Sequence, residues 1–122
     1  MNRYFMKPNN AAYIAHIRDA IDQIVLYAAR HTHDQYLQNL WDQAAVARNL
    51  EIISEAATQL TTEYKNAYPA IPWRKISDFR NVLTHEYFAV DPDLVWEILQ
   101  KDIPLLHKQI KELLVEFHQK NI

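Results

Sequence analysis

The chain has 122 residues, and its 13 Lys and Arg against 15 Asp and Glu give a formal net charge of −2 at pH 7. A molecule with no overall basic field is not drawn to nucleic acid by bulk electrostatics alone. The chain also has no Gly and no Cys. Without Gly, the usual glycine-rich phosphate-binding loops are excluded and two-residue hairpins are disfavoured. Without Cys, disulfides and thiolate chemistry are excluded.

The composition, 49% hydrophobic and 23% charged, predicts one ordinary globular domain over residues 1–122. The longest unbroken apolar run covers only residues 24–29, far short of the roughly 20 residues that cross a membrane. The opening residues lack the apolar stretch of a signal peptide. We therefore expect no membrane association and a cytoplasmic location.

Two apolar stripes with helical spacing lie in the first half of the chain. The first predicts a helix over residues 10–30, and Asp34 is a candidate cap for the next helix. The second stripe, which includes Leu40 and Trp41, runs from Leu37 to Leu60. It predicts one long helix or two short helices in series. Alanines at positions 44, 45, 47, 56 and 57 would let a neighbouring helix approach closely, at the centre of a bundle or in a subunit contact.

Prolines divide the second half of the chain. Those at positions 69 and 72 predict a turn, and a third helix follows over residues 73–84. Asp91 and Pro92 are typical of a helix start, and the fourth apolar stripe continues to residue 117, with a kink or a division expected at Pro104. The predicted fold class is therefore all-α, as a four- to five-helix up-down bundle.

One arginine and one histidine carry the candidate chemistry. Arg80 follows the apolar Phe79, so we expect it on or beside the apolar stripe, where an internal ion pair with Glu51 or Glu55 could neutralise it. Catalysis is the other interpretation. The imidazole of His85 can move a proton near neutral pH, and a guanidinium can hold a phosphate. Together they suit metal-free RNA cleavage, in which the ribose 2′-hydroxyl attacks the adjacent phosphate.

These two groups diverge on a straight helix. Asn81 and His85 share a face, whereas Arg80 and His85 point about 140° apart. They converge if the helix ends near His85, or if a second copy supplies the missing group across a two-fold axis. This divergence and the alanine stripe favour a homodimer.

Other histidines are expected to be structural. His31 and His33 with Asp34 invite a metal interpretation, but no third clear ligand accompanies them, so we predict solvated loop residues and no metal or cofactor site. His107 and His118 are expected to be structural or surface residues.

Arg74 and Lys75 lie just before the Arg80 segment. They are candidate RNA contacts that could form a local positive rim with Arg80. A solvated helix start explains them equally well.

The amino-acid sequence of four segments closely resembles the HepT-like branch of the HEPN superfamily. The segments are NLEIISEA at 49–56, YPAIPWRKI at 68–76, RNVLTHEYF at 80–88 and DPDLVWEIL at 91–99. The resemblance implies an all-helical, dimerising ribonuclease toxin whose substrates include tRNA and mRNA. It also implies a partner, an MntA-type nucleotidyltransferase antitoxin.

The family motif consists of an Arg, a His five residues after it and a Tyr two residues after the His. In this chain these residues are Arg80, His85 and Tyr87. By resemblance, Arg80 and His85 are catalytic, Asn81 supports them, and Tyr87 accepts AMP from the partner enzyme. Adenylylation would put a negative phosphate beside groups that must bind RNA. The chain departs from the family where many relatives have Gly: at positions 54, 78, 86 and 89 it has Ser, Asp, Glu and Ala. The carboxylate of Glu86 could raise the pKa of His85 or repel RNA.

Two other functions compete with the ribonuclease interpretation. The chain could be a non-catalytic helical binding or regulatory subunit of a nucleotidyltransferase. It could also be a dimeric helical scaffold in which Arg80 and His85 only support packing. Mixing partner-free protein with total RNA would separate the first function from these two.

Overall fold

The computed structural model describes residues 9–83 and 91–120. In these ranges the chain forms helices without strands, which confirms the predicted all-α class. The helices are α1 (Asn10–Arg30), α2 (His33–Leu37), α3 (Leu40–Gln59), α4 (Thr62–Ala67), α5 (Trp73–Leu83) and α6 (Pro92–Lys120). The sequence predicted four to five helices, and the difference lies in the short α2 and α4. The stripe from Leu37 to Leu60 forms one long helix over Leu40–Gln59, in agreement with the first of the two predicted alternatives.

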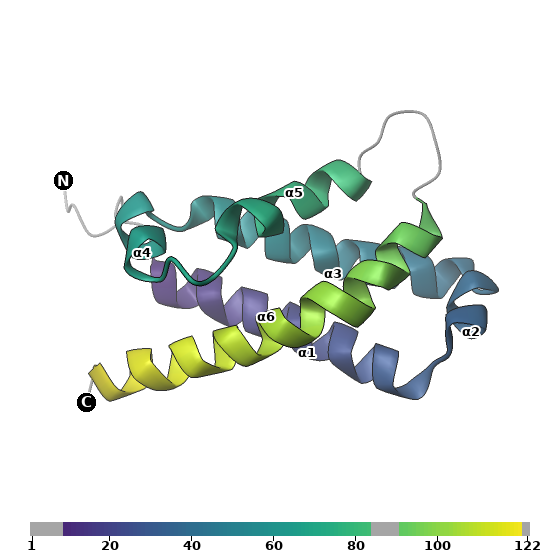
Figure 1. Cartoon of the computed structure of the whole chain (residues 1–122), viewed down its shortest axis with the longest axis horizontal. Coiled ribbons are helices and arrows are strands. Elements are labelled where there is room, and N and C mark those ends of the chain that lie inside the picture. Colours follow the sequence, from purple (N-terminus) through teal and green to yellow (C-terminus); the bar gives the residue numbers. More distant parts are fainter. Residues whose placement is uncertain (1–8, 84–90, 121–122) are drawn as a thin grey trace.

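The four longer helices alternate in direction along the bundle (Figure 1). Helix α3 packs against both α1 and α5, and α6 packs against α1. Helix α2 joins α1 to α3 at one end of the bundle, and α4 joins α3 to α5 at the other end. This up-down arrangement places α1, α3 and α5 in consecutive contact.

One cluster of buried apolar side chains fills the space between these helices. It includes Ile14, Ile17, Ile21 and Ile24 of α1 and Leu50 and Ile53 of α3, as the helical spacing predicted. The start of the second stripe departs from this prediction. Leu40 and Trp41 are 78% and 87% exposed. Both stand in the first turn of α3, on its solvent-exposed side.

The alanines of α3 differ in their exposure to solvent. Ala56 and Ala57 are buried in the core, where their small side chains let the neighbouring helices approach. Ala44 and Ala45 are exposed and follow Trp41 on the outer side of α3. We call Leu40, Trp41, Ala44 and Ala45 the α3 apolar face.

Polar side chains cap the starts of the helices. Asn9, Asn39 and Thr61 each accept a hydrogen bond from the amide three residues further on. At α2, Thr32 and Gln35 form a reciprocal capping box. Thr32 is therefore the cap in this segment, and the prediction of Asp34 was wrong. Each such cap stabilises its helix by about 1 kcal/mol.

The helix ends explain how the fold forms without Gly. The C-cap residues of α1 to α4 have φ of −133°, −87°, −67° and −128°. None of these four adopts the left-handed conformation that favours Gly. The helices therefore end in backbone conformations that any residue can adopt.

Ser54 fixes the contact between α3 and α5. Its side chain has no exposed surface, and its Oγ donates a hydrogen bond of 2.8 Å to the backbone carbonyl of Ser77. A buried hydroxyl needs such a partner, because desolvating it without one costs free energy. The bond ties α3 to α5 one turn before Arg80.

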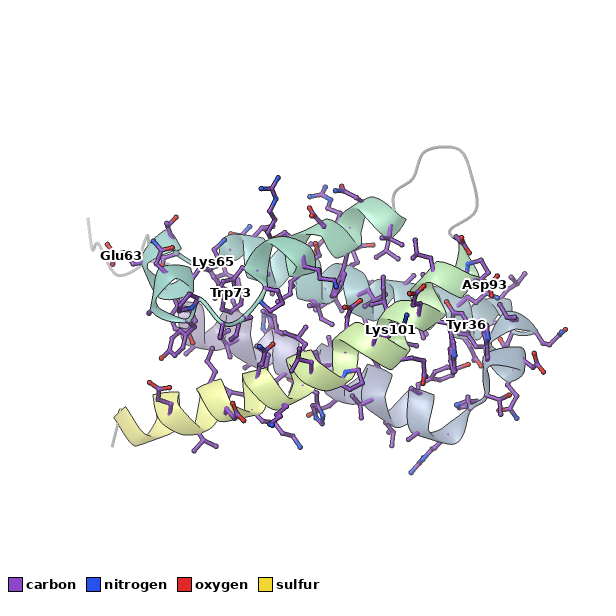
Figure 2. All side chains as sticks on the ribbon, viewed as in Figure 1. Tyr36, Glu63, Lys65, Trp73, Asp93 and Lys101 are labelled. Atoms are coloured by element: carbon purple, nitrogen blue, oxygen red, sulfur yellow. The ribbon has the colours of Figure 1, made fainter. Side chains whose placement is uncertain are left out.

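Trp73 holds the predicted proline turn between α4 and α5 (Figure 2). Its indole Nε1 donates to the carbonyl oxygens of Lys65 and Tyr68, each at 3.1 Å. Both carbonyl groups also accept a backbone amide, so the indole adds a second donor to each at the end of α4. The start of α5 is fixed by this contact.

Helix α6 continues through Pro104 and ends at Lys120, so the predicted division of this helix does not occur. Ile103 and Leu106 on either side of the proline are buried. Their packing holds the helix together across the backbone hydrogen bond that proline cannot donate. No helix in the described part of the chain combines the length and the apolar character that spanning a membrane would need.

Candidate functional site

A surface cavity of about 690 Å³ is formed by α1 and α3, and Arg80 of α5 also lines it. We call it the Arg80 cavity. From α1 it is lined by Tyr13, His16, Asp19, Ala20 and Gln23, and from α3 by Arg48, Asn49, Ile52, Glu55, Ala56, Thr58 and Gln59. Cavities of about 300–1,000 Å³ are typical of small-molecule sites. This one brings the arginine of the predicted motif together with polar groups from two other helices.

Helical spacing explains why these side chains share one cavity. Tyr13, His16 and Gln23 recur at steps of three and seven residues and so lie along one face of α1. On α3, Ile52 and Glu55 lie three residues apart and so share one face of the helix. Because α3 also packs against α5, the Arg80 side chain stands at the edge of the same surface.

Arg80 lies beside the apolar stripe of α5, on its exposed side. Phe79 is buried in the core, whereas Arg80 and Asn81 are exposed. This agrees with the prediction that Arg80 stands next to the stripe. An exposed guanidinium at a cavity wall can meet an anionic ligand by two parallel hydrogen bonds.

The two carboxylates predicted to neutralise Arg80 have different surroundings. Glu51 forms an ion pair with Arg48, with Nη1 and Oε1 2.8 Å apart. Glu55 is exposed and lines the Arg80 cavity. Glu51 is therefore engaged within α3, and Glu55 is the carboxylate that shares a surface with Arg80.

Arg74 and Lys75, the candidate RNA contacts, do not line the Arg80 cavity. Nζ of Lys75 lies 2.6 Å from Oδ1 of Asp102 on α6. Lys75 thus faces the groove between α5 and α6. Arg74 is exposed at the start of α5. The structure therefore does not bring Lys75 into a common positive rim with Arg80.

His85, Tyr87, Glu86 and Ala89 lie outside the described residues.

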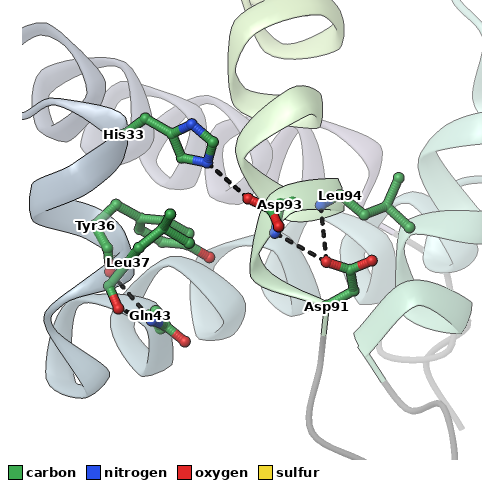
Figure 3. A network of polar contacts seen from close by, with 7 residues as sticks. All are labelled: His33, Tyr36, Leu37, Gln43, Asp91, Asp93 and Leu94. Carbon is green, nitrogen blue, oxygen red and sulfur yellow. Dashed lines mark hydrogen bonds and ion pairs between the residues drawn. The ribbon is translucent and has the colours of Figure 1, made fainter.

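The start of α6 is held by polar contacts (Figure 3). Oδ1 of Asp91 accepts hydrogen bonds from the amides of Asp93 and Leu94, which confirms Asp91 as the cap of α6. Oδ1 of Asp93 lies 2.9 Å from Nε2 of His33 on α2. The chain that follows the motif is therefore attached to the α2 end of the bundle.

Aromatic packing supports this attachment. The ring of Trp96 on α6 stacks on His33 at 5.4 Å and meets Tyr36 at 5.3 Å. Tyr36 is only 1% exposed, and its burial raises the pKa of its phenol to about 12. The phenol therefore stays neutral and packs as part of the core.

The remaining described histidines make structural contacts. His31 stacks on Tyr27 at 4.0 Å, and Nε2 of His107 lies 3.2 Å from Oδ1 of Asp22. The prediction that His33 is a solvated loop residue was wrong, because it begins α2 and contacts Asp93. Among the residues that the structure describes, no cluster of three or more His, Cys, Asp or Glu side chains could hold a metal ion. The side chain of His118 is not among those described.

Sequence reasoning missed the cavity residues that come from other helices. Tyr13, His16, Arg48 and Asn49 share the cavity with Arg80, although they are far from it in the chain. The available signal was a second, polar stripe on each helix, running beside the apolar one. Helical periodicity gives each stripe, but it does not say which stripes face each other.

Comparison with known proteins places the chain in a family. The family described as "Ribonuclease HepT-like" matches residues 17–113. The chain is 34% identical to "Probable ribonuclease HepT" of Thermococcus cleftensis, over 88% of this chain and 98% of that protein. It is 33% identical to "Putative RNase TTE0752" of Caldanaerobacter subterraneus subsp. tengcongensis, over 84% of this chain and 91% of that protein.

A third relative is longer. The chain is 36% identical to "Gamma-glutamylcyclotransferase and putative RNase MJ0434" of Methanocaldococcus jannaschii, over 91% of this chain, and spans half the length of that protein. No solved structure matches the chain significantly. The family match covers most of the chain, so the chain belongs to the HepT-like ribonuclease family.

Proposed function

We propose that this chain is a metal-independent endoribonuclease toxin of a toxin–antitoxin pair. Membership of a ribonuclease family supports the activity, and relatives named as ribonucleases support it further. The single structural observation that carries the proposal is the position of Arg80. Its side chain is exposed and lines a cavity with polar and apolar walls, where an RNA phosphate could reach it.

The proposed chemistry needs one proton-transfer group and one phosphate-binding group. The ribose 2′-oxygen bonds to the adjacent phosphorus and loses its proton, and the bond from phosphorus to the 5′-oxygen breaks as that oxygen gains a proton. Arg80 stabilises the charge that builds on the phosphate. His85 is the general acid and base, and Asn81 orients the reacting groups.

A homodimer belongs to this proposal. Arg80 and His85 diverge by about 140° on a straight helix, so a second copy would complete the site. The α3 apolar face is a candidate for the contact, because Leu40 and Trp41 are 78% and 87% exposed beside the small Ala44 and Ala45. Contiguous exposed apolar side chains on a soluble protein are typical of an interaction surface.

The antitoxin is proposed to be an MntA-type nucleotidyltransferase that transfers AMP from ATP to the Tyr87 hydroxyl and releases pyrophosphate. The attached phosphate would carry a negative charge close to Arg80 and His85 and would compete with RNA. Incubating purified chain with the partner and ATP should add the mass of one adenylyl group, which is AMP minus water, to the peptide that contains Tyr87. A Tyr87→Phe chain should remain unmodified and active, and modification of that variant would contradict the assignment.

The nuclease proposal is tested with protein isolated without its partner. Total RNA, including tRNA and mRNA, should yield discrete fragments in the presence of a chelator. The His85→Ala variant should lose cleavage and toxicity while keeping its helix content and its mass in sedimentation. Undiminished cleavage by His85→Ala would refute the catalytic role. Stable partner binding without cleavage of any RNA would instead favour a regulatory subunit of the nucleotidyltransferase.

A further inference from the structure

The Arg80 cavity extends well beyond Arg80 itself. Twelve of its lining residues come from α1 and α3, and Arg80 is the α5 contribution. Its volume of about 690 Å³ exceeds what one phosphate group needs and is within the range of sites for larger ligands. The ligand that Arg80 binds therefore has room to continue between α1 and α3.

The charges of the lining do not suit a second phosphate. Glu55 and Asp19 bring carboxylates into the cavity, and phosphate oxygens would repel them. Of the positive groups, Arg48 is already paired with Glu51 at 2.8 Å. Asp19 is itself paired with Arg18 at 2.9 Å. Mixed charge of this kind fits a neutral ligand with both hydrogen-bond donors and acceptors.

The exposed polar groups match the edge of an unpaired base. Side-chain amides of Gln23 and Gln59 offer both donors and acceptors. The Glu55 carboxylate can accept from an exocyclic amino group, as Glu and Asp do from cytosine N4. Thr58, whose hydroxyl donates to the backbone carbonyl of Glu55 at 2.6 Å, steadies the helix there. Uracil has no exocyclic amino group to offer.

The cavity also has an apolar and aromatic wall. Ile52 and Ala56 of α3 lie in the lining with Tyr13 of α1. The Tyr13 ring is partly buried and meets His16 edge-on, with ring centres 6.3 Å apart at 88°. That contact orients the tyrosine. Proteins bind unpaired RNA bases by stacking on aromatic side chains and by hydrogen bonds to the base edges.

We infer that the Arg80 cavity is a base-recognition site, in which α1 and α3 bind an unpaired RNA base next to the phosphate held by Arg80. This inference rests on the proposed ribonuclease function and adds a determinant of substrate choice. Glu55 selects a base with an exocyclic amino group, and Tyr13 supplies the stacking surface. Neither residue takes part in proton transfer.

The test uses oligoribonucleotides of uridine that contain one adenosine, cytidine or guanosine. The wild-type chain should cleave beside one of the amino-bearing bases with a higher kcat/KM than in the all-uridine strand. Glu55→Ala, which removes both acceptor oxygens, should reduce that ratio at least fivefold, chiefly through KM, because one good carboxylate contact to a base edge discriminates by about 1–3 kcal/mol. Glu112→Ala, which removes an exposed carboxylate of α6 outside the cavity, should leave the ratio unchanged.

A second variant removes the stacking surface. Tyr13→Leu should raise the KM for the preferred strand and weaken binding of its 2′-deoxy, uncleavable form, because base stacking contributes about 1–3 kcal/mol. Equal effects of Glu55→Ala on all strands, or no effect of either variant, would overturn the inference while the nuclease function stands. Equal effects would indicate a phosphate or subunit contact instead. A wild-type chain that cleaves none of the strands and no total RNA would overturn both proposals.

Discussion

Replacing Ser54 tests how α3 and α5 are held together. Ser54→Ala removes the 2.8 Å hydrogen bond to the Ser77 carbonyl and keeps the helix-forming Cβ. A carbonyl inside a helix still accepts from the amide four residues on, so no polar group is stranded. The expected loss in the free energy of unfolding is about 1 kcal/mol. Ser54→Gly loses the same bond and is about 1 kcal/mol less stable than the Ala variant, because Gly forms helices less readily. The expected total loss in the free energy of unfolding is about 2 kcal/mol.

Urea unfolding measures both changes. With a slope of about 2 kcal/mol per molar urea for a small protein, the midpoints should fall by about 0.5 M for Ser54→Ala and about 1 M for Ser54→Gly. Thr58→Ala is the matched control, because it removes a hydroxyl-to-carbonyl bond from the exposed side of the same helix. It should change the midpoint less than either variant. A Ser54→Gly protein as stable as wild type would refute the reasoning.

Arg80, Tyr36 and Trp41 offer three further tests. Arg80→Gln should lower the cleavage rate about 10²–10³-fold. It should lower the urea midpoint by no more than about 0.5 M, because contacts of an exposed charged side chain contribute about 0–1 kcal/mol. An equal loss of cleavage in Lys111→Gln, a surface change on α6, would contradict a specific role. The pKa of the Tyr36 phenol in the folded state, about 12, exceeds its unfolded value near 10. Its contribution to stability is therefore complete below pH 10 and is lost as the pH rises through about 12. Tyr36→Phe should flatten this part of the curve of unfolding free energy against pH, and identical curves would show that Tyr36 is not responsible. Trp41→Asp should give a monomer in sedimentation, and a persistent dimer would exclude the α3 apolar face as its contact.

Helical periodicity predicted the longer helices well, because a packed helix must bury one side. The stripe from Ile14 to Ile24 is buried as expected, and α1 has the predicted bounds. The same rule failed at Trp41, because a stripe can run past the end of the core into solvent. The short α2 was missed, although Thr32 and Gln35 carry the pattern of a capping box.

The candidate site could be predicted only where its residues are neighbours in the chain. Arg80 was found from its place beside Phe79, and it does line a cavity. Glu55 was named as one possible partner of Arg80, whereas Tyr13 was not connected with it, because the approach of Tyr13 to Arg80 depends on how α1, α3 and α5 pack. Lys75 was grouped with Arg80 from adjacency along the chain, whereas the turn of the helix directs it to Asp102. The roles of His85 and Tyr87 remain predictions.

The helix ends without Gly also affect the unfolded chain. Average composition would give roughly eight or nine Gly in a chain of this length, and this one has none. Each Gly replaced by Ala at a compatible position favours folding by about 0.4–1 kcal/mol, because the denatured chain has fewer backbone conformations to lose. Part of the stability of this protein therefore comes from restricting its denatured ensemble.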